Sequence, residues 1–309
     1  MAGIGQTHGK IILIGEHAVV YGQPAITIPL LDIPTIVKIT PIDESTSQLS
    51  SRYFEGPITN CPPELAGIRI LIELLTKDLP IATTFKVTIN SDLPIERGMG
   101  SSAATGAAIT KAMFDYAKVP LEYSELIHYT NFSEKIIHGT PSGIDAITVN
   151  SQQPIYFIKN KITQPFSMNL AAYLVIIDSG IKGNTGAAVH DLRVFKQQQP
   201  QIVNPFLEQL GDLTQQTQQA IAQHDIKTLG QIFQTAQNIL QTLNISNATL
   251  DKLVSTANLA GALGTKITGG GRGGCLIALA PTKTIAQKIT QAVSSQAQKV
   301  WIQSLANLK

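Results

Sequence analysis

The chain has 309 residues, and its 23 basic side chains nearly balance its 21 acidic ones, so that the formal net charge is +2. A charge this small excludes attraction to nucleic acid or to an anionic membrane by the molecule as a whole. With 43% hydrophobic and only 14% charged residues, the composition is that of a compact globular protein. Because single cores usually split at this length, we expect a coupled pair of lobes.

Other classes of protein are disfavoured by the cysteines and by the apolar stretches. Cys61 and Cys275 are the two cysteines, and they cannot by themselves make a disulfide framework or a four-ligand zinc site. The longest strongly apolar stretches, such as Ala171–Ile177, have the length of a strand, so no membrane span is expected. The first ten residues lack the basic start and apolar run of a secretory signal. We therefore expect a cytoplasmic protein.

The first half of the chain is predicted to be rich in strands. Apolar or alternating β-branched runs predict strands at Ile11–Ile14, Ala25–Ile28 and Lys86–Asn90, the second interrupted by Pro29. Helical spacing predicts helices over Ser102–Tyr116 and Leu121–Ile137, the latter ended by Gly139 and Pro141.

The second half is predicted to be rich in helices. Tyr173–Ile177 and Cys275–Ala280 are predicted strands, with Thr265–Thr268 as a short strand before a glycine cluster. Amphipathic spacing predicts helices over 206–223, 226–243, 250–263 and 282–305. The fold class is therefore α+β, with lobes over residues 1–165 and 166–309. The final helix could also return to the first lobe.

A first glycine cluster, Gly98–Gly106, leads into the predicted helix that starts at Ser102. Glycines at 98 and 100 permit backbone conformations closed to other residues, and the N–H groups of a helix start attract phosphate oxygens. The adjacent hydroxyls of Ser101 and Ser102 could bind phosphate or Mg²⁺. No Gly-Lys-Ser/Thr follows, which excludes a Walker loop, and the context of a dinucleotide fingerprint is absent. A helix start that merely packs closely is the alternative.

A second glycine cluster, Gly269–Gly274, surrounds Arg272 with five glycines. A simple hairpin needs only one or two glycines, so this cluster indicates a backbone that closely approaches a ligand. Arg272 could offer a fork-shaped cation to a phosphate.

Two carboxylates lie in a third segment, Glu134 near a helix end and Asp145 beyond Gly139, Pro141 and Gly143. Paired carboxylates near phosphate loops suit one Mg²⁺ ligand and one base. A capping aspartate and a solvated glutamate are the alternative.

A fourth segment places Lys10 just before an apolar strand and Glu16 and His17 just after it. Charged residues at strand ends are often only solvated, and a lone histidine is more often structural than catalytic. Taken alone, this segment is only suggestive.

Taken in order, the four segments resemble those of the GHMP small-molecule kinases, from residue 9 to residue 280. The opening Gly9–Gly22, with its run Gly-Glu-His-Ala-Val-Val-Tyr-Gly, and the segment His138–Asp145 resemble the branch that phosphorylates mevalonate. Galactokinases follow Gly-Glu-His with a different run, and phosphomevalonate kinases typically have Tyr in place of His17. The resemblance implies a two-lobed fold with the active site in the cleft between the lobes. It also implies transfer of phosphate from ATP to the primary hydroxyl of mevalonate, with Mg²⁺ as cofactor.

The resemblance also implies roles for single residues. Asp145 would be the catalytic base and a substrate contact, with Lys10 beside it to favour the ionised carboxylate. Ser102 and Glu134 would hold Mg²⁺, while Glu16, His17 and Thr185 would bind mevalonate. The ATP-binding residues would be Gly98, Met99, Gly100, Ser101, Ser102, Ala103, Ala104, Gly269, Gly270 and Gly271.

The chain departs from the family pattern at three places. Met99 replaces the usual Leu, a volume-conserving change. Gly270 and Arg272 stand where Ala and Gly are more common, which leaves the role of Arg272 open. Gly183 stands where many relatives have an arginine, with Lys182 adjacent.

Three other functions are alternatives to this expectation. A sibling kinase for another small alcohol or phosphate ester is the nearest alternative, and residues 15–22 and 138–145 favour mevalonate over it. A ligand sensor without catalysis would not need Lys10, Ser102, Glu134 and Asp145 together. A nicotinamide dehydrogenase is disfavoured because the first glycine cluster lacks the sequence context of a dinucleotide-binding fingerprint. A homodimer is left open.

Overall fold

The computed structural model describes residues 2–138, 143–183, 185–306 and 308. The chain forms two compact units that are not consecutive in sequence. Unit 1 contains residues 1–10, 30–95 and 100–150, and unit 2 contains residues 11–29, 96–99 and 151–309. The last third of β1 (Gly3–Ile14) and the first part of β2 (Ala25–Pro41) therefore belong to unit 2.

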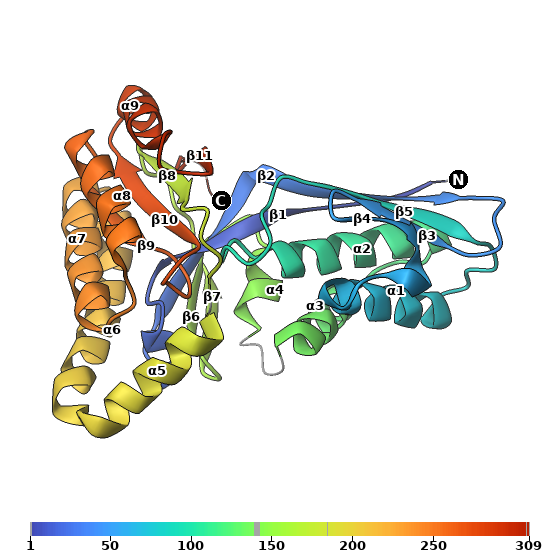
Figure 1. Cartoon of the computed structure of the whole chain (residues 1–309), viewed down its shortest axis with the longest axis horizontal. Helices are drawn as coiled ribbons and strands as arrows, with labels where there is room; N and C mark the ends of the chain where they lie inside the picture. Colours follow the sequence, from blue (N-terminus) through green and yellow to red (C-terminus); the bar gives the residue numbers. More distant parts are fainter. Residues whose placement is uncertain (1, 139–142, 184, 307, 309) are drawn as a thin grey trace. The chain divides into compact units, whose positions relative to one another are not determined.

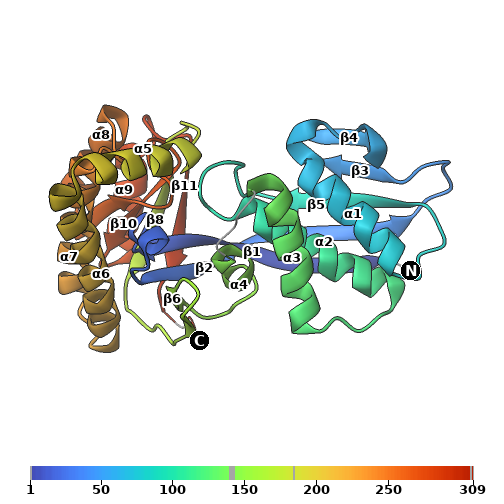
Figure 2. The ribbon, with the colours of Figure 1, turned by 90° about the horizontal axis from the view of Figure 1, so that it is seen from below.

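Unit 1 is a sheet covered by helices on one face (Figures 1 and 2). Its strands run in the order β4-β3-β5-β2, with β1 paired to β2. The remaining strands are β3 (Gln48–Ser51), β4 (Phe54–Pro57) and β5 (Phe85–Ser91). The helices are α1 (Ala66–Asp78), α2 (Ser101–Ala117), α3 (Tyr123–His138) and α4 (Ile144–Thr148), with 3₁₀ turns at Ile58–Asn60 and Pro63–Leu65.

The core of unit 1 lies between this sheet and helices α1 and α2. Val37 and Val87 from the sheet belong to the same buried cluster as Leu71 from α1 and Ile109 from α2. Helix α2 packs so closely on β1 that a Cβ added at Gly5 would lie only 2.0 Å from the carbonyl oxygen of Ala108. Small residues on both elements thus bring the helix that starts at the glycine loop into close contact with the strand that carries Lys10.

Unit 2 contains a four-stranded sheet in the order β11-β8-β10-β9. The strands are β8 (Tyr173–Asp178), β9 (Gly264–Ile267), β10 (Cys275–Ala280) and β11 (Lys299–Ser304). Every residue of β10 is buried, which explains its uninterrupted apolar sequence. Residues 25–27 of β2 pair with β6 (Ile155–Ile158), and β6 pairs with β7 (Ile162–Pro165).

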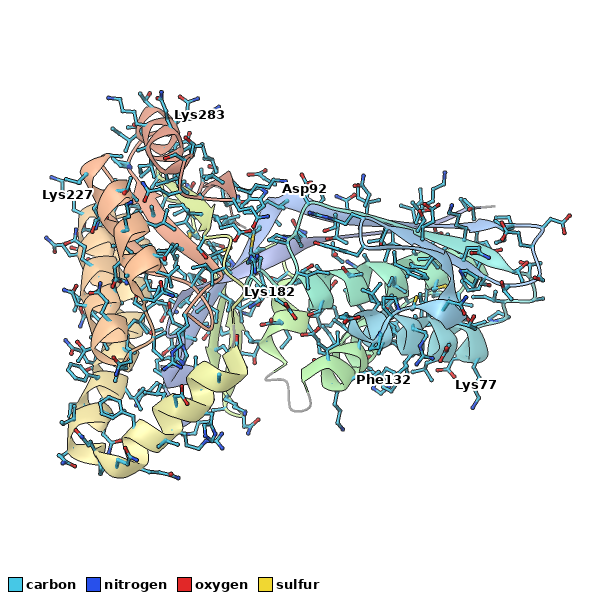
Figure 3. All side chains as sticks on the ribbon, in the orientation of Figure 1. Lys77, Asp92, Phe132, Lys182, Lys227 and Lys283 are labelled. Atoms are coloured by element: carbon cyan, nitrogen blue, oxygen red, sulfur yellow. The ribbon has the colours of Figure 1, made fainter. Side chains whose placement is uncertain are left out.

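Helices α7 (Ile226–Thr242), α8 (Ala248–Leu259) and α9 (Lys283–Val293) pack against this sheet, and α6 (Pro200–Ala222) packs against α7. Unit 2 also contains α5 (Thr185–Gln198) and the 3₁₀ turn η1 (Ala18–Tyr21). The starts of α7, α8 and α9 are fixed by side-chain caps from Asp225, Asn247 and Thr282. Charged side chains such as Lys227 and Lys283 point outward from these helices (Figure 3).

The predicted α+β class is confirmed, and two predicted elements were wrong. Residues 282–305 do not form one helix, because α9 ends at Val293 and Lys299–Ser304 forms β11, which pairs with β8. Pro29 does not end its strand: it lies between the residues of β2 that pair with β6 and those that pair with β5, and so interrupts neither ladder. No helix within the described part of the chain is long and apolar enough to span a membrane.

Candidate active site

The glycine loop leads into helix α2 through a left-handed residue. Gly100 has φ of +70° and caps the helix, and its carbonyl oxygen accepts a hydrogen bond from the Ala104 N–H at 2.9 Å. The first N–H groups of such a helix have no partner within the helix. Ser101 and Ser102 are partly exposed there, whereas Met99, Ala103 and Ala104 are buried. The helix start can therefore offer N–H groups and two hydroxyls to an anion.

Lys10 connects this helix start to the predicted base. Its Nζ lies 3.0 Å from Oδ1 of Asp145, and the lysine side chain is 5% exposed against 32% for the aspartate. Asp145 is in the first turn of α4, which follows Gly143 in the left-handed region with φ of +82°. A Cβ at Gly100 would lie only 2.7 Å from Cγ of Lys10, so the lysine stem packs on the glycine loop. The predicted neighbours Lys10 and Asp145 are thus in direct contact.

The two residues predicted to hold a metal lie on helices that pack against each other. Glu134 is buried on α3, and Ser102 is the second residue of α2. In the described part of the chain no group of three or more His, Cys, Asp or Glu side chains could hold a metal ion. Mg²⁺ is usually held by one or two carboxylates together with substrate phosphates and water. One carboxylate on α3 and one hydroxyl at the start of α2 are residue types that fit that mode.

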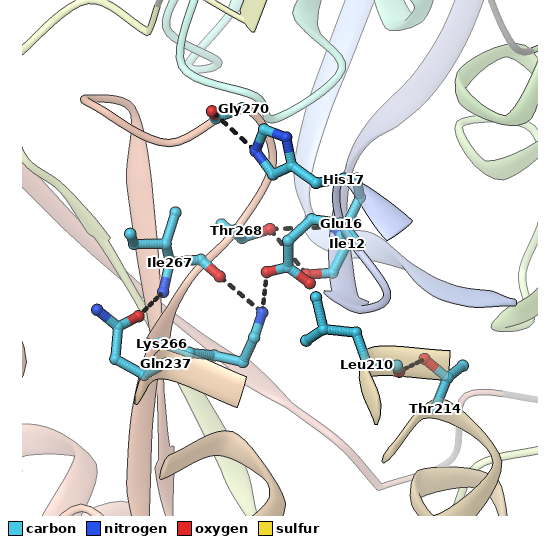
Figure 4. Close-up of polar contacts among 10 residues, drawn as sticks. All are labelled: Ile12, Glu16, His17, Leu210, Thr214, Gln237, Lys266, Ile267, Thr268 and Gly270. Atoms are coloured by element: carbon cyan, nitrogen blue, oxygen red, sulfur yellow. Dashed lines mark hydrogen bonds and ion pairs between the residues drawn. The ribbon is translucent and has the colours of Figure 1, made fainter. Parts of the chain in front are cut away.

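Glu16 forms a buried ion pair with Lys266 in unit 2 (Figure 4). Glu16 is 1% exposed and Lys266 is fully buried, and the lysine Nζ also donates to the carbonyl oxygen of Ile267 at 2.6 Å. Burial raises the pKa of Glu16 and lowers the pKa of Lys266, and the attraction between the two charges opposes both shifts. The second carboxylate oxygen of Glu16 has no hydrogen-bond partner among the described residues.

His17 is held against the second glycine cluster. Its Nε2 lies 3.1 Å from the carbonyl oxygen of Gly270 (Figure 4), and desolvation lowers the pKa of the buried imidazole to about 4. The ring is therefore neutral at pH 7. Because a carbonyl oxygen only accepts, Nε2 carries the proton and Nδ1 is an acceptor. Within the described chain the buried Nδ1 has no hydrogen-bond partner, so it is the ring nitrogen whose accepting capacity is unused.

The second glycine cluster brings Thr185 next to His17. A Cβ at Gly270 would lie 2.2 Å from Oγ1 of Thr185, at the start of α5, and 2.9 Å from its Cα. Gly269 and Gly271 have φ of +81° and +70°, conformations that favour glycine. The absent side chain at 270 thus lets Thr185, His17 and the glycine backbone meet in one place. Of the four residues predicted to bind mevalonate, Glu16, His17 and Thr185 lie in unit 2 and Asp145 lies in unit 1.

Arg272 is engaged by the protein itself. Its Nη1 forms an ion pair with Asp191 on α5, and its Nε donates to the carbonyl oxygen of Asn244 at 3.0 Å. Its φ of +56° is unusual for a residue with a side chain. The guanidinium therefore links the glycine cluster to its neighbours, which accounts for an arginine at this position without a phosphate.

Two ion pairs were missed by the sequence analysis. Lys266 lies within the predicted strand Thr265–Thr268 and was given no role, although a lysine inside an apolar strand is a signal for a buried partner. Arg97 and Asp178, which form the other pair, were given no role. The segment 139–142, which contains part of the His138–Asp145 motif, lies outside the described residues.

The comparisons with known proteins agree with one family. The model for the N-terminal domain of GHMP kinases matches residues 67–151, and the model for their C-terminal domain matches residues 217–299. The mevalonate kinase of Pyrococcus abyssi is 30% identical over 296 residues, which cover 89% of this chain and 87% of that protein. The chain belongs to the GHMP kinases.

Two solved structures extend this similarity to the fold. The mevalonate kinase of methicillin-resistant Staphylococcus aureus MRSA252 is 30% identical, with a TM-score of 0.78 and 99% of each chain covered. The mevalonate kinase of L. major, in complex with R-mevalonate, is 26% identical, with a TM-score of 0.85 and coverage of 99% of this chain and 96% of the other. This chain is therefore a phosphotransferase with the GHMP kinase fold.

Proposed function

We propose that this kinase transfers the γ-phosphate of ATP to the primary hydroxyl of mevalonate, giving 5-phosphomevalonate and ADP. The observation that carries the proposal is the position of Lys10, which contacts both Asp145 and the glycine loop. A base for the acceptor hydroxyl and a cradle for the donor phosphate are thereby joined through one cation. The choice of mevalonate is supported by mevalonate kinases to which this chain is similar over most of their length.

Asp145 acts as the base in this proposal. Its carboxylate accepts the proton of the primary hydroxyl as that oxygen forms a bond to the γ-phosphorus and the bond from phosphorus to ADP breaks. Lys10 compensates the negative charge of the carboxylate and of the transferring phosphoryl group. Phosphoryl transfer depends mostly on the positioning of the reactants and on charge neutralisation, so few side chains take part in covalent or proton-transfer steps.

The nucleotide is bound by backbone groups in the proposed mechanism. The N–H groups at the N-terminus of α2 would bind its phosphates, and the second glycine-rich segment would supply further backbone contacts. The proposed contacts are Gly98, Met99, Gly100, Ser101, Ser102, Ala103, Ala104, Gly269, Gly270 and Gly271. Ser102 and Glu134 would hold Mg²⁺, which neutralises phosphate charge when it is bound.

The substrate is oriented by residues of unit 2 in this proposal. The neutral His17 accepts a hydrogen bond from mevalonate at Nδ1, because its other nitrogen is committed to Gly270. Glu16 and Thr185 complete the contacts, one held by Lys266 and the other seated against Gly270.

An ADP-release assay with mevalonate, phosphomevalonate, galactose and homoserine side by side tests the function. Mevalonate should give the highest kcat/KM. Activity on one of the other three without activity on mevalonate would identify a sibling kinase, and binding without turnover would identify a ligand sensor.

A further inference from the structure

Arg97 and Asp178 form a buried ion pair in unit 2. Arg97 lies in the connection between β5 and α2, directly before Gly98, and Asp178 is the last residue of β8. The Nε of Arg97 is 3.0 Å from Oδ1 of Asp178, with side chains 10% and 3% exposed. The Nη2 of Arg97 donates to the carbonyl oxygen of Gly180 at 3.0 Å, and the Gly180 N–H donates to Oδ1 of Asp178 at 2.9 Å.

The backbone around Arg97 is fitted to the same surroundings. The carbonyl oxygen of Glu96 accepts a hydrogen bond from the Gly183 N–H at 3.1 Å. A Cβ at Gly274 would lie 3.1 Å from the carbonyl oxygen of Arg97, and one at Gly98 would lie 3.6 Å from the carbonyl oxygen of Thr268. Residues 96–98 therefore rest on the segment after β8 and on the second glycine cluster.

The contacts of the guanidinium distinguish two possible roles for Arg97. An arginine in a phosphate loop can bind phosphate directly, which requires donors that face the ligand. Here Nη2 donates to the carbonyl oxygen of Gly180, and Nε lies at ion-pair distance from Asp178. Nε and Nη1 are buried and have no hydrogen-bond partner among the described residues, so neither faces open solvent. These contacts are those of an anchor, which holds the loop rather than its ligand.

We propose that Arg97 and Asp178 are positioning residues that fix the backbone of Gly98 and Met99 in the conformation that binds nucleotide. The proposal rests on the proposed function, because it assumes that this loop binds ATP. The planar guanidinium is suited to the task, since it joins one carboxylate and one carbonyl in a fixed geometry that a lysine cannot reproduce.

The two residues should act as one unit. If the pair works through the loop, Arg97→Met and Asp178→Asn should each raise the Kd for ATP by about tenfold, which corresponds to ~1.4 kcal/mol. The Kd of the double variant for ATP should be no higher than that of the single variant with the higher Kd, because the second substitution removes an interaction that is already lost. Arg97→Lys should recover only part of the affinity.

Direct binding of a fluorescent ATP analogue in the presence of Mg²⁺, without mevalonate, measures these effects. Arg69→Met and Glu73→Gln remove an exposed arginine–carboxylate pair on α1 and serve as controls, whose Kd should match that of the wild type. A single variant that fails to fold is replaced by the double variant, in which neither charge is left buried alone. That double variant should still show the raised Kd.

Two results would overturn the proposal. A raised Kd for Arg97→Met with an unchanged Kd for Asp178→Asn would show direct contact between arginine and phosphate. A lower melting temperature with unchanged Kd in both variants would show a structural role only. A wild-type protein that binds ATP but does not phosphorylate mevalonate would contradict the proposed function and leave the anchor testable by the same Kd values.

Discussion

At the scale of single residues, the candidate site depends on backbone positions that few residue types adopt. Gly15 and His17 have φ of +93° and +61° on either side of Glu16. With φ of +61° and ψ of −48°, His17 lies outside the left-handed helical region, in a sparsely populated conformation that costs about 1–3 kcal/mol, so it is held there by its surroundings, including the carbonyl oxygen of Gly270. This turn buries the Glu16 side chain and places His17 on the glycine cluster.

The role of Asp145 is tested by removing its basicity while keeping its shape. Asp145→Asn should lower kcat by about 10²- to 10⁴-fold, as expected for the loss of a general base. The affinity for ATP should change far less, because the glycine loop is intact. The ADP-release assay gives kcat and nucleotide titration gives Kd. Near-normal turnover in the variant would exclude Asp145 as the base.

The buried His17 should make stability depend on pH. Its pKa is lowered to about 4 in the folded protein, against an ordinary value near 6.5 in the unfolded chain. Between these values the unfolded chain binds a proton that the folded protein does not, so stability falls as the pH falls. From pH 7.5 to pH 5 the loss due to His17 should be about 2 kcal/mol.

Urea unfolding of the wild type and of His17→Asn at both pH values isolates this contribution. Glu16, Lys266 and Arg272, the charged groups around His17, are present in both proteins, so that their contributions cancel in the comparison. The variant should lose less stability on acidification. Equal losses in the two proteins would mean that His17 does not carry the effect.

At the scale of elements, close packing of α7 on β9 depends on a pair of facing glycines. A Cβ at Gly264 would lie 2.1 Å from the carbonyl oxygen of Gly230, and one at Gly230 would lie 2.6 Å from Cβ of Leu263. This proximity also allows Oε1 of Gln237 on α7 to accept a hydrogen bond from the Ile267 N–H. The strand that leads to the second glycine cluster is therefore placed by its contact with α7.

Gly264→Ala should destabilise the protein by about 1–3 kcal/mol, the usual cost of overpacking. Gly106→Ala is the matched control, because a Cβ there would lie 3.4 Å or more from its neighbours, an ordinary contact distance. In helix α2 that control should be neutral or stabilise by about 0.5–1 kcal/mol. Urea unfolding measures both variants, and equal stabilities would contradict the packing argument.

At the scale of the whole molecule, unit 2 requires a segment from the start of the chain. Residues 11–29 belong to it, and Ile11, Leu13 and Ile14 are completely buried. The partner of the fully buried Lys266 is Glu16, from the same segment. Residues 151–309 therefore do not contain all the contacts of unit 2.

Expression of residues 166–309 alone tests this dependence and the proposed lobe boundary after residue 165. We expect no cooperative unfolding transition, because the fragment would leave Lys266 buried without its carboxylate and expose the apolar surface that covers β1. Co-expression with residues 1–165 should restore the transition. A fragment that unfolds cooperatively on its own would show that residues 11–29 are dispensable.

The local elements could be read from sequence where one physical signal dominates. The apolar run Cys275–Ala280 is a buried strand, and the Ala-rich segment after the glycine loop is helix α2. The glycine clusters and the charged residues beside them identified the kinase family. In contrast, residues 299–304 pair with the edge of β8, a contact that local periodicity does not contain, and they were predicted to be helical.

The sequence by itself determined the chemistry of this protein, because glycines, hydroxyls and charges in a particular order specify what a loop can bind. The tertiary structure alone decided which charges meet. Lys266 and Glu16 are 250 positions apart, and Arg97 and Asp178 come from a loop and from the end of a strand. Because a buried charge is stable only beside its partner, these pairs depend on the packing of distant elements, which no local pattern encodes.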